Sequence, residues 1–340
     1  MSSGYISTTL DTAQYTSSNR IMTEMKAIQI LGDVSSPKVA TNKSLTRPVP
    51  KGTEILIRVL AAGVTGDEVL WPEVYENPCR IPGHDVSGVI EALGPDYNGP
   101  LKIGQDVVAL LATDRGQGQA EYTICFADEV APKPASMAHE EAAALPIPVL
   151  TAWEAIVDHG KVAPGMRVLV TGASGAVGIL AVQLATKLAG ADVIALASSR
   201  NHDALKKLGV HEVRDYNTPG WEGNIKDVDM VLDTVGGNVL TKTWDTVKSD
   251  GTIVTVGDPA PDWAFGKGNA AESVTHPNVR YMHFIVSPNS QKLSQALEMI
   301  AKGSIKPLEV ESFPFEKAEM AWERARQRGR GKKVVITFEG

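Results

Sequence analysis

The stretch VLVTGASGAVG at residues 168–178 decides the fold of this chain, because an apolar run leads directly into a glycine-rich turn and a helix-like stretch. In this order the strand delivers the backbone, Gly175 lets it approach a phosphate, and Gly178 lets the new helix pack closely on the strand. The helix N-terminus then offers unpaired N–H groups and a positive dipole end to an anion. We therefore expect the turn to hold the pyrophosphate of a dinucleotide cofactor. The residues concerned are Ser174, Gly175, Ala176 and Val177.

The kind of cofactor is decided about 20 residues further on, at the end of the second strand of such a unit. A carboxylate there would bind a ribose 2′-hydroxyl and repel a 2′-phosphate. This chain has Ser198-Ser199-Arg200 and no acid before Asp203. A guanidinium matches phosphate oxygens in forked geometry, and hydroxyls can donate to them. The sequence therefore predicts NADP(H) rather than NAD(H); the alternative for Arg200 is an exposed arginine at a strand end.

Length and composition set the class of protein. A chain of 340 residues is longer than one ordinary domain, so two are expected. Its hydrophobic content of 43% and charged content of 21% are typical of a globular protein with sizeable cores. The net charge of −7 argues against nucleic acid or an anionic membrane as the main partner. We expect a small electrophilic molecule as the substrate instead.

The compartment is predicted to be the cytoplasm. No apolar stretch approaches the roughly 20 residues that span a bilayer, and the two cysteines stand in unrelated contexts, as in a reducing compartment. Residues 1–24 are rich in Ser and Thr and predict a disordered tail. A mitochondrial presequence is the alternative, although such segments are Arg-rich and Arg20 stands alone.

Two patterns of sequence follow one another after the tail. Residues 25–135 carry short β runs separated by Gly and Pro, which predict a mainly β domain. From Arg167 strands alternate with helices, the pattern of a doubly wound parallel sheet, so the fold class is α/β. The expected strands are 26–30, 54–61, 86–92, 106–111, 120–125, 168–171, 193–197, 212–214, 230–234, 252–256 and 281–286. The expected helices in the second part are 178–188, 203–208 and 239–247.

Further helices are expected between the two parts and after the second part. A helical stretch at 139–145 is expected to break at Pro146 and Pro148, and a second helix to run over 151–159. An amphipathic helix is expected at 290–301, and a final strand at 334–338 should fold back onto the first domain. The basic run over 324–333 indicates a solvated helix end and turn, with contacts to cofactor phosphates as the alternative.

This arrangement resembles the medium-chain dehydrogenase/reductase superfamily over nearly all of residues 25–340, and most of all its zinc-free quinone oxidoreductase and enoyl reductase branches. The resemblance implies a GroES-like substrate domain over 25–148 plus 289–340 and a Rossmann NADP(H) domain over 149–288, with the active site in the cleft between them. The motifs that carry it are Ala61-Ala62-Gly63-Val64, Pro82-Gly83-His84-Asp85-Val86-Ser87-Gly88-Val89, Ala120-Glu121-Tyr122, Glu140–Leu145, Leu150-Thr151-Ala152-Trp153, the glycine turn, Asp233-Thr234-Val235-Gly236-Gly237 and Gly331-Lys332-Lys333-Val334-Val335.

The same resemblance also indicates whether this chain keeps the residues that bind zinc in metal-dependent relatives. Thr65 stands where metal-dependent relatives have a cysteine ligand, His84-Asp85 stand for their histidine–glutamate pair, and the third ligand position falls near Ile147. His84 and Asp85 alone cannot close a tetrahedral site, so we expect no metal. Asp85 is expected instead to accept backbone N–H bonds in a turn.

Chemistry without a metal favours conjugated acceptors. Hydride delivered to a β-carbon leaves a delocalised enolate that hydrogen bonds can stabilise, and a quinone likewise gives a delocalised anion. We therefore predict an NADPH-dependent reductase of an α,β-unsaturated carbonyl compound or a quinone. Two alternatives stay open. One is a trans-acting enoyl reductase of a polyketide assembly line, which requires a docking partner, and the other is an NADPH-binding structural or sensor protein without turnover.

Three residues are candidates for the catalytic chemistry. Tyr75 lies in a stretch that resembles the loop carrying a substrate-facing tyrosine in enoyl reductases, and a neutral phenol can donate to an enolate. Its alternative is a structural tyrosine packed under the loop. Thr65 and Asp67 stand where relatives have polar active-site residues, whereas Glu68 is expected to be solvated or structural.

Further cofactor contacts are implied by position in the superfamily. Thr151 is expected beside the nicotinamide, with a helix N-cap as its alternative, and Tyr216 on the 2′-phosphate or adenine ribose, with a simple strand end as its alternative. Val235 and Gly257 should line the cofactor channel, because ligands lie beyond strand C-termini, and Phe284 should border the nicotinamide. A homodimer through the edge strand 281–286 is common in the superfamily and is one expectation; a monomer, as in some enoyl reductases, is the alternative.

Overall fold

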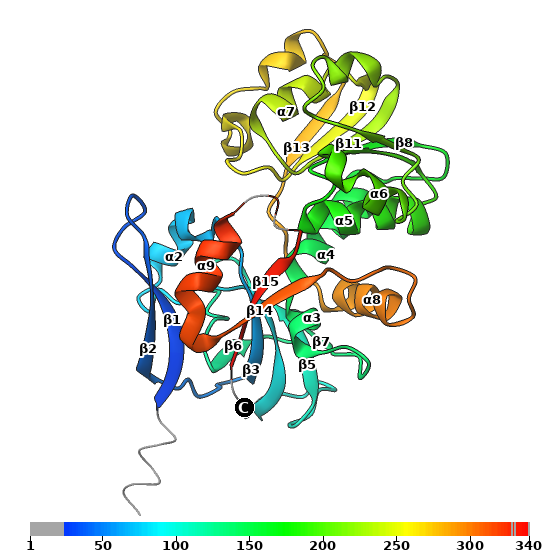
Figure 1. Ribbon diagram of the computed structural model, residues 1–340. Coiled ribbons are helices and arrows are strands. Elements are labelled where there is room, and N and C mark those ends of the chain that lie inside the picture. The colour runs from blue at the N-terminus through cyan, green and yellow to red at the C-terminus, as the bar shows by residue number, and fades with distance from the viewer. Residues whose placement is uncertain (1–23, 328, 330, 339–340) are drawn as a thin grey trace, which may run out of the picture.

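Three β-sheets organise the residues that the computed structural model describes, which are 24–327, 329 and 331–338 (Figure 1). One sheet is six-stranded and parallel, one is seven-stranded and largely antiparallel, and the third is a two-stranded hairpin. The predicted disordered tail lies outside the described residues, except for Glu24, which begins the first strand.

The parallel sheet has the order β10-β9-β8-β11-β12-β13. The chain builds β8, β9 and β10 towards one edge and then crosses back to build β11, β12 and β13 towards the other. The strand order therefore reverses between β8 and β11, and the crevice at the carboxyl ends there is where doubly wound sheets bind dinucleotides. These strands are β8 (Arg167–Thr171), β9 (Asp192–Leu196), β10 (Glu212–Arg214), β11 (Val228–Asp233), β12 (Val247–Thr255) and β13 (Arg280–His283).

Both faces of this sheet are covered, which explains its nearly continuous apolar strands. Val170 and Leu232 pack into the cluster on one face, and Leu169 and Val231 into the cluster on the other. The helices of this part are α4 (Pro146–Trp153), α5 (Ala176–Gln183), α6 (His202–Lys206) and α7 (Gly237–Thr243), with wider π-type turns at Glu154–His159 and Leu184–Leu188.

The seven-stranded sheet has the order β14-β15-β3-β4-β5-β7, and β6 pairs with β3. Val335 in β15 lies opposite Gly63 in β3, so the final strand returns to the first part of the chain, as the sequence predicts. The elements are β1 (Glu24–Leu31) and β2 (Lys38–Thr46) of the hairpin, β3 (Ile55–Gly63), β4 (Asp85–Leu93), β5 (Asp106–Leu110), β6 (Tyr122–Cys125), β7 (Val130–Pro132), β14 (Val310–Pro314), β15 (Lys333–Thr337), α2 (Pro72–Glu76), α3 (His139–Ala143), α8 (Ser290–Ala301) and α9 (Ala318–Arg326).

One apolar core connects the two larger sheets. Leu110 of β5, Leu150 of α4, Leu180 of α5 and Leu297 of α8 belong to the same buried cluster. Helices α4 and α8 therefore join the parts, and the predicted domain boundary at residue 148 falls inside α4. The division into 25–148 plus 289–340 and 149–288 stays a prediction.

The predicted break before Pro146 is confirmed, because α3 ends at Ala143, but the second helix begins at Pro146 and not at Thr151. Helix α4 begins at Pro146 and includes Pro148. A proline in the first turn costs no hydrogen bond, because the first N–H groups of a helix have no partner within it. Thr151 consequently lies inside the helix and does not cap it, since the N-cap position is Leu145. The hairpin strand β2 was not predicted, and of helix α9 only the end was predicted, from the basic run over 324–333.

Candidate active site

The glycine-rich turn adopts the geometry that its sequence predicts. Gly172 has a φ of +58°, a left-handed value that favours glycine, and the Gly175 N–H donates to the Gly172 carbonyl at 2.8 Å. A Cβ on Gly178 would lie 2.4 Å from the same carbonyl oxygen, so only glycine lets α5 approach the strand this closely. Helix α5 begins at Ala176, and its N-terminus faces the turn.

A pocket of about 140 Å³ opens between this turn and the C-terminal segment. Its walls include residues of the turn and two lysines from the far end of the sequence. The helix N-terminus suits a phosphate group, and Lys332 lines the same pocket. The alternative interpretation of the basic run, as a contact to cofactor phosphates, thus gains support. The lining residues are Ser174, Gly175, Ala176, Ile179, Leu308, Glu309, Gly329, Gly331, Lys332 and Lys333.

The predicted ribose end lies at the carboxyl ends of β9 and β10. The Ser199 N–H donates to the Asp215 carboxylate at 3.1 Å, which ties the two loops together. Hydrogen bonds, first of all from the Asn217 N–H, lower the pKa of Asp215. Arg200 donates to the Gly329 carbonyl at 3.4 Å and so reaches the segment that lines the pocket. Tyr216 follows Asp215 and is 50% exposed. Ser198 joins the same loop through its hydroxyl, which accepts from Asn201.

A buried carboxylate fixes the carboxyl ends of three strands. Asp233, fully buried, accepts hydrogen bonds from the Thr171 hydroxyl at 2.6 Å, the Thr255 hydroxyl at 2.7 Å and the Gly236 N–H at 2.9 Å. The three strands are β8, β11 and β12, at the point where the strand order reverses. Sequence reasoning named Asp233 only as part of a motif and missed this role.

The residues after these strands are held tightly. A Cβ on Gly257 would lie 2.4 Å from the Gly236 nitrogen, so the loops after β11 and β12 touch. Val235 lies in the first loop and Gly257 in the second, at the edge where the sequence predicts the cofactor channel. Beyond β13, Phe284 packs on His159 with ring centroids 4.6 Å apart. Thr151 is 5% exposed within α4.

Tyr75 is engaged within its own part of the chain. Its hydroxyl donates to the Val69 carbonyl at 2.6 Å, and the Arg80 guanidinium lies over its ring at 5.7 Å. Partial burial raises the pKa of the phenol. These contacts favour the alternative of a structural tyrosine packed under the loop, and the role of Tyr75 as proton donor stays a prediction. Asp67, by contrast, is exposed at the start of the short 3₁₀ turn Glu68–Leu70.

Comparison with known proteins agrees with this geometry. Residues 51–139 match the model of the alcohol dehydrogenase GroES-like domain, and residues 208–336 match that of zinc-binding dehydrogenases. A probable mitochondrial zinc-binding oxidoreductase of Arthroderma benhamiae is 31% identical over 86% of this chain and 91% of its own length. The chain belongs to the medium-chain dehydrogenase/reductase superfamily.

Two further members of this superfamily indicate which type of oxidoreductase the chain is. The mitochondrial NAD(P)H oxidoreductase RTN4IP1 of Homo sapiens is 33% identical over 74% of this chain and 69% of its own length. The structure of a quinone oxidoreductase from Coxiella burnetii superposes with a TM-score of 0.80 at 28% identity, covering 93% of this chain and all of that one. The present medium-chain dehydrogenase/reductase is thus an oxidoreductase of the quinone oxidoreductase type, with a GroES-like and a Rossmann part and a nicotinamide cofactor.

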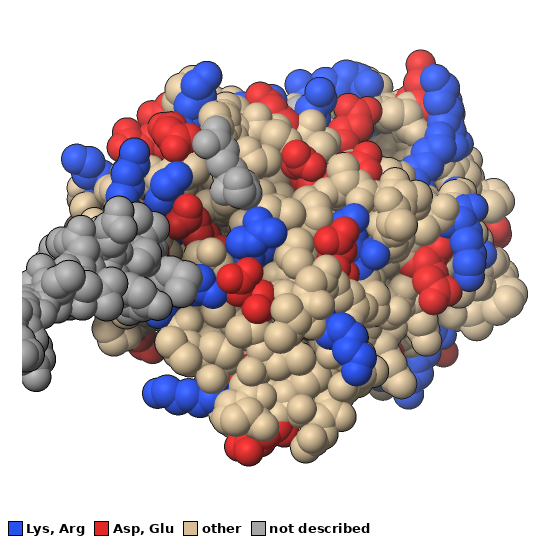
Figure 2. All heavy atoms as spheres, turned by 90° about the horizontal axis from the view of Figure 1, so that it is seen from below, with Lys and Arg blue, Asp and Glu red and all other residues tan. Residues whose placement is uncertain are grey.

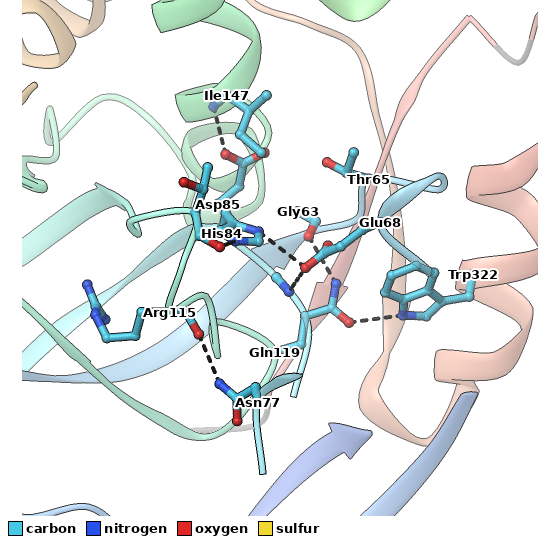
Figure 3. A network of polar contacts seen from close by, with 12 residues as sticks. Gly63, Thr65, Glu68, Asn77, His84, Asp85, Arg115, Gln119, Ile147 and Trp322 are labelled. Carbon is cyan, nitrogen blue, oxygen red and sulfur yellow. Dashed lines mark hydrogen bonds and ion pairs between the residues drawn. The ribbon is translucent and has the colours of Figure 1, made fainter. Parts of the chain in front are cut away.

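The positions that bind zinc in metal-dependent members are occupied differently here (Figure 3). Asp85 accepts the Ile147 N–H at 2.7 Å, so the expected bond from Asp85 to the backbone is present. Its other oxygen lies 3.3 Å from the ammonium of Lys333, which also donates to the Thr65 hydroxyl at 3.2 Å. Burial raises the pKa of Asp85 against the opposing effect of Lys333. An ammonium thus lies between two of the ligand positions.

The His84 side chain is likewise held by a neighbouring residue. Its Nδ1 lies 3.2 Å from the Glu68 carboxylate, which also accepts the Gly83 N–H at 2.6 Å. Burial alone would lower the pKa of His84, but the Glu68 carboxylate raises it overall. Glu68 itself is 1% exposed and structural. Within residues 24–327, 329 and 331–338, no three His, Cys, Asp or Glu side chains form a group that could hold a metal ion. These donors do not fit a zinc ion.

Proposed function

We propose that this protein is an NADPH-dependent oxidoreductase that works without a metal and transfers hydride to an α,β-unsaturated carbonyl compound or a quinone. The observation that carries the proposal is the buried Lys333 ammonium on Asp85 and Thr65, where metal-dependent members have ligands. A metal there would meet a cation and a hydroxyl instead of thiolates. The residues therefore favour substrates whose product anion needs no Lewis acid.

The preference for the phosphorylated cofactor rests on the loop after β9. NADPH, when bound, supplies the hydride from its nicotinamide. Ser198, Ser199 and Arg200 provide two hydroxyls and a guanidinium, and a carboxylate does not directly follow β9. Asp215 lies nearby, but its charge is satisfied by the Ser199 and Asn217 N–H groups. The guanidinium therefore stays the group best suited to a 2′-phosphate.

Conjugated acceptors match the remaining groups of the site. The enolate or quinol anion left by hydride addition is stabilised by hydrogen bonds and then takes up a proton. The Lys333 side chain, 5% exposed, donates to the Thr65 hydroxyl and lies beside Asp85. Positioning of the acceptor between the two parts of the chain supplies much of the acceleration.

The decisive test is oxidation of NADPH and NADH with enals, enones, quinones and enoyl thioesters, combined with elemental analysis. We expect turnover with NADPH and at least one free conjugated acceptor, and no stoichiometric zinc. One tightly bound zinc per chain would overturn the metal-free mechanism. Activity confined to carrier-bound enoyl groups would support the polyketide alternative. Saturable NADPH binding without turnover across the panel would support the structural or sensor alternative.

We also propose that two copies associate through β13. This strand forms an edge of the parallel sheet, and open edges pair readily with another strand. Met282 in β13 is 36% exposed, and Ile285, two residues after the end of this strand, is 61% exposed. Ile285→Arg is expected to convert a two-chain mass in light scattering to a one-chain mass, whereas Val49→Arg, at an exposed site of the other part, should not. A two-chain mass that survives Ile285→Arg would contradict this interface.

The other partners and the compartment are proposals as well. On the face in Figure 2, Lys and Arg are interspersed with Asp and Glu, which supports a partner other than nucleic acid.

The residues that the structure describes include no helix long and apolar enough to cross a membrane. We propose a cytoplasmic location. The mitochondrial names of two relatives support the alternative that residues 1–24 are a targeting segment.

A further inference from the structure

A buried lysine joins side chains from the ends of three strands. Lys333 begins β15, Thr65 follows β3, and Asp85 begins β4. The Val64 N–H donates to the Val334 carbonyl at 2.9 Å, so the pairing of the two backbones places Thr65 beside Lys333. Lys333 also lines the pocket at the glycine turn. The three side chains therefore lie next to the proposed cofactor site.

The contact with Lys333 decides which hydrogen bonds the Thr65 hydroxyl can still make. An ammonium only donates, so the contact of 3.2 Å between Lys333 Nζ and Thr65 Oγ1 uses the hydroxyl oxygen as an acceptor. The O–H of Thr65 consequently points away from Lys333. Within residues 24–327, 329 and 331–338, no acceptor takes this O–H. The hydroxyl therefore keeps its donor for a ligand.

This arrangement also strengthens the donor. A hydroxyl that accepts one hydrogen bond is polarised by it and donates the next one more strongly. Lys333 is itself held in place, because its Nζ lies 3.3 Å from the carboxylate of Asp85. The direction of the Thr65 O–H is thus fixed before a ligand binds, which is the condition for stabilising a developing anion.

Burial decides which of the three side chains a ligand can reach. The side chains of Lys333 and Asp85 are 5% and 1% exposed, whereas Thr65 is half-buried. A Cβ on Gly66 would lie 2.5 Å from the Ala325 carbonyl oxygen, so helix α9 packs directly against the turn that carries Thr65. A ligand would therefore meet the hydroxyl, while the two charged groups stay covered.

Helix α4 connects these side chains with the nicotinamide end of the cofactor, and here the inference rests on the proposed function. The Ile147 N–H donates to Asp85 at 2.7 Å, so Asp85 lies against the first turn of α4 (Figure 3). Thr151, which is expected beside the nicotinamide, follows Ile147 by one turn on the same face of the helix. The Thr65 hydroxyl therefore lies on the side of the site where the hydride acceptor is expected.

We propose that the Thr65 hydroxyl is a catalytic donor to the substrate oxygen and that Lys333 is the positioning residue that directs its O–H. Hydride addition to the β-carbon moves the C=C pair to the neighbouring bond and the C=O pair onto oxygen, which becomes the enolate anion. The Thr65 O–H donates a hydrogen bond to this anion and keeps its proton. The α-carbon then takes one proton from water, and the cofactor is oxidised as the acceptor is reduced. The oxygen anion of a reduced quinone is held in the same way.

The first test compares kcat and KM for the best conjugated acceptor of the panel. Thr65→Val removes the O–H, keeps the shape of the side chain and should lower kcat roughly 100-fold. The KM for the acceptor should change by less than about threefold, because the hydrogen bond strengthens only as the anion forms. Thr65→Ser restores a hydroxyl and should recover most of the lost rate. A Thr65→Val variant with the kcat of the wild type, or a Thr65→Ser variant as slow as Thr65→Val, would overturn the proposal.

The role of Lys333 is tested by a double-mutant cycle with Thr65. Lys333→Met alone should lower kcat roughly 10-fold, because the O–H loses its fixed direction. In the Thr65→Val background the same change should lower kcat by less than about twofold, since no O–H remains to be directed. Equal effects in both backgrounds would show a general structural role and overturn the positioning role. Lys317→Met, at an exposed lysine directly before α9, is the matched control and should behave like the wild type.

A further variant keeps this test independent of folding. Lys333→Met leaves the buried Asp85 carboxylate without a cation, which is destabilising. The double variant Lys333→Met/Asp85→Asn removes both charges together, and the Asn side chain still offers an oxygen to the Ile147 N–H. It should show the same dependence on Thr65. NADPH titration and a cooperative urea transition establish that each variant is folded.

The second test needs no turnover. Infrared spectra of cinnamaldehyde bound together with NADP⁺ report a hydrogen bond to its carbonyl oxygen as a lowered stretching frequency. We expect this lowering in the wild type and in Thr65→Ser, and its loss in Thr65→Val and Lys333→Met. A band that is not lowered in the wild type, or is unchanged by Thr65→Val, would overturn the roles of Thr65 and Lys333 even if acceptors are reduced. A lowered band that depends on Thr65, without reduction of any acceptor, would overturn the proposed function instead.

Discussion

Replacing Arg200 with Asp is expected to raise the KM for NADPH by roughly 10- to 100-fold and to change the KM for NADH by less than about threefold. The guanidinium lies at the carboxyl end of β9, and its contact with the Gly329 carbonyl directs it towards the pocket between the glycine turn and the C-terminal segment. A carboxylate at this position would repel a 2′-phosphate but can accept from a 2′-hydroxyl. Initial rates at varied concentrations of each cofactor measure the effect.

Lys206→Asp serves as its control. This exposed lysine on α6 gives the same change of charge close to Arg200 in the sequence. If both variants raise the two KM values equally, the effect comes from the change in net charge. Arg200 then does not bind the 2′-phosphate. Arg200→Lys should lie between the wild type and Arg200→Asp, because an ammonium keeps the charge and loses the forked geometry.

Asp233→Ala is expected to lower the free energy of unfolding by about 3 to 5 kcal/mol. Its carboxylate is fully buried and accepts from two threonine hydroxyls and the Gly236 N–H, and alanine would leave all three donors without it. The change should also weaken NADPH binding, because the loops after β11 and β12 are fixed through this carboxylate. Urea denaturation followed by fluorescence measures the first effect and cofactor titration the second.

Asp245→Ala provides the comparison for this variant, since Asp245 is an exposed aspartate two residues after the end of α7. Its free energy of unfolding should stay within about 0.5 kcal/mol of the wild type. A free energy of unfolding of Asp233→Ala equally close to that of the wild type would contradict the prediction. It would show that the hydroxyls find other acceptors and that the hydrogen bonds of Asp233 contribute little to stability.

The sequence predicts the fold well, because the decisive signals are local. The strand, glycine turn and helix at 168–178 form as expected, and the close approach of Gly178 to the Gly172 carbonyl gives the physical reason for that glycine. The alternation of strands and helices correctly predicts the doubly wound sheet. The helix break before Pro146 is confirmed, but the start of the second helix at residue 151 was wrong, because prolines are tolerated in the first turn of a helix and α4 begins at Pro146.

The candidate active site, by contrast, could be predicted only in part from the sequence. Nothing near Lys333 in the sequence indicates that its ammonium lies on Asp85, since the two residues meet through the pairing of β15 with β3. Asp233 likewise gains its hydrogen-bond donors from strands distant in sequence. The loop of Tyr75 resembles a catalytic one, yet the hydroxyl turns to the Val69 carbonyl. Side-chain direction depends on tertiary packing, which a local pattern does not contain.

The late position of β15 along the chain has a consequence for biosynthesis. Lys332 and Lys333 leave the ribosome after every other residue that lines the pocket at the glycine turn. A nascent chain can therefore assemble the whole parallel sheet while this pocket still lacks one wall. Premature termination before Lys332 would remove both lysines from the pocket and would leave residues 61–63 of β3 without their partners in β15.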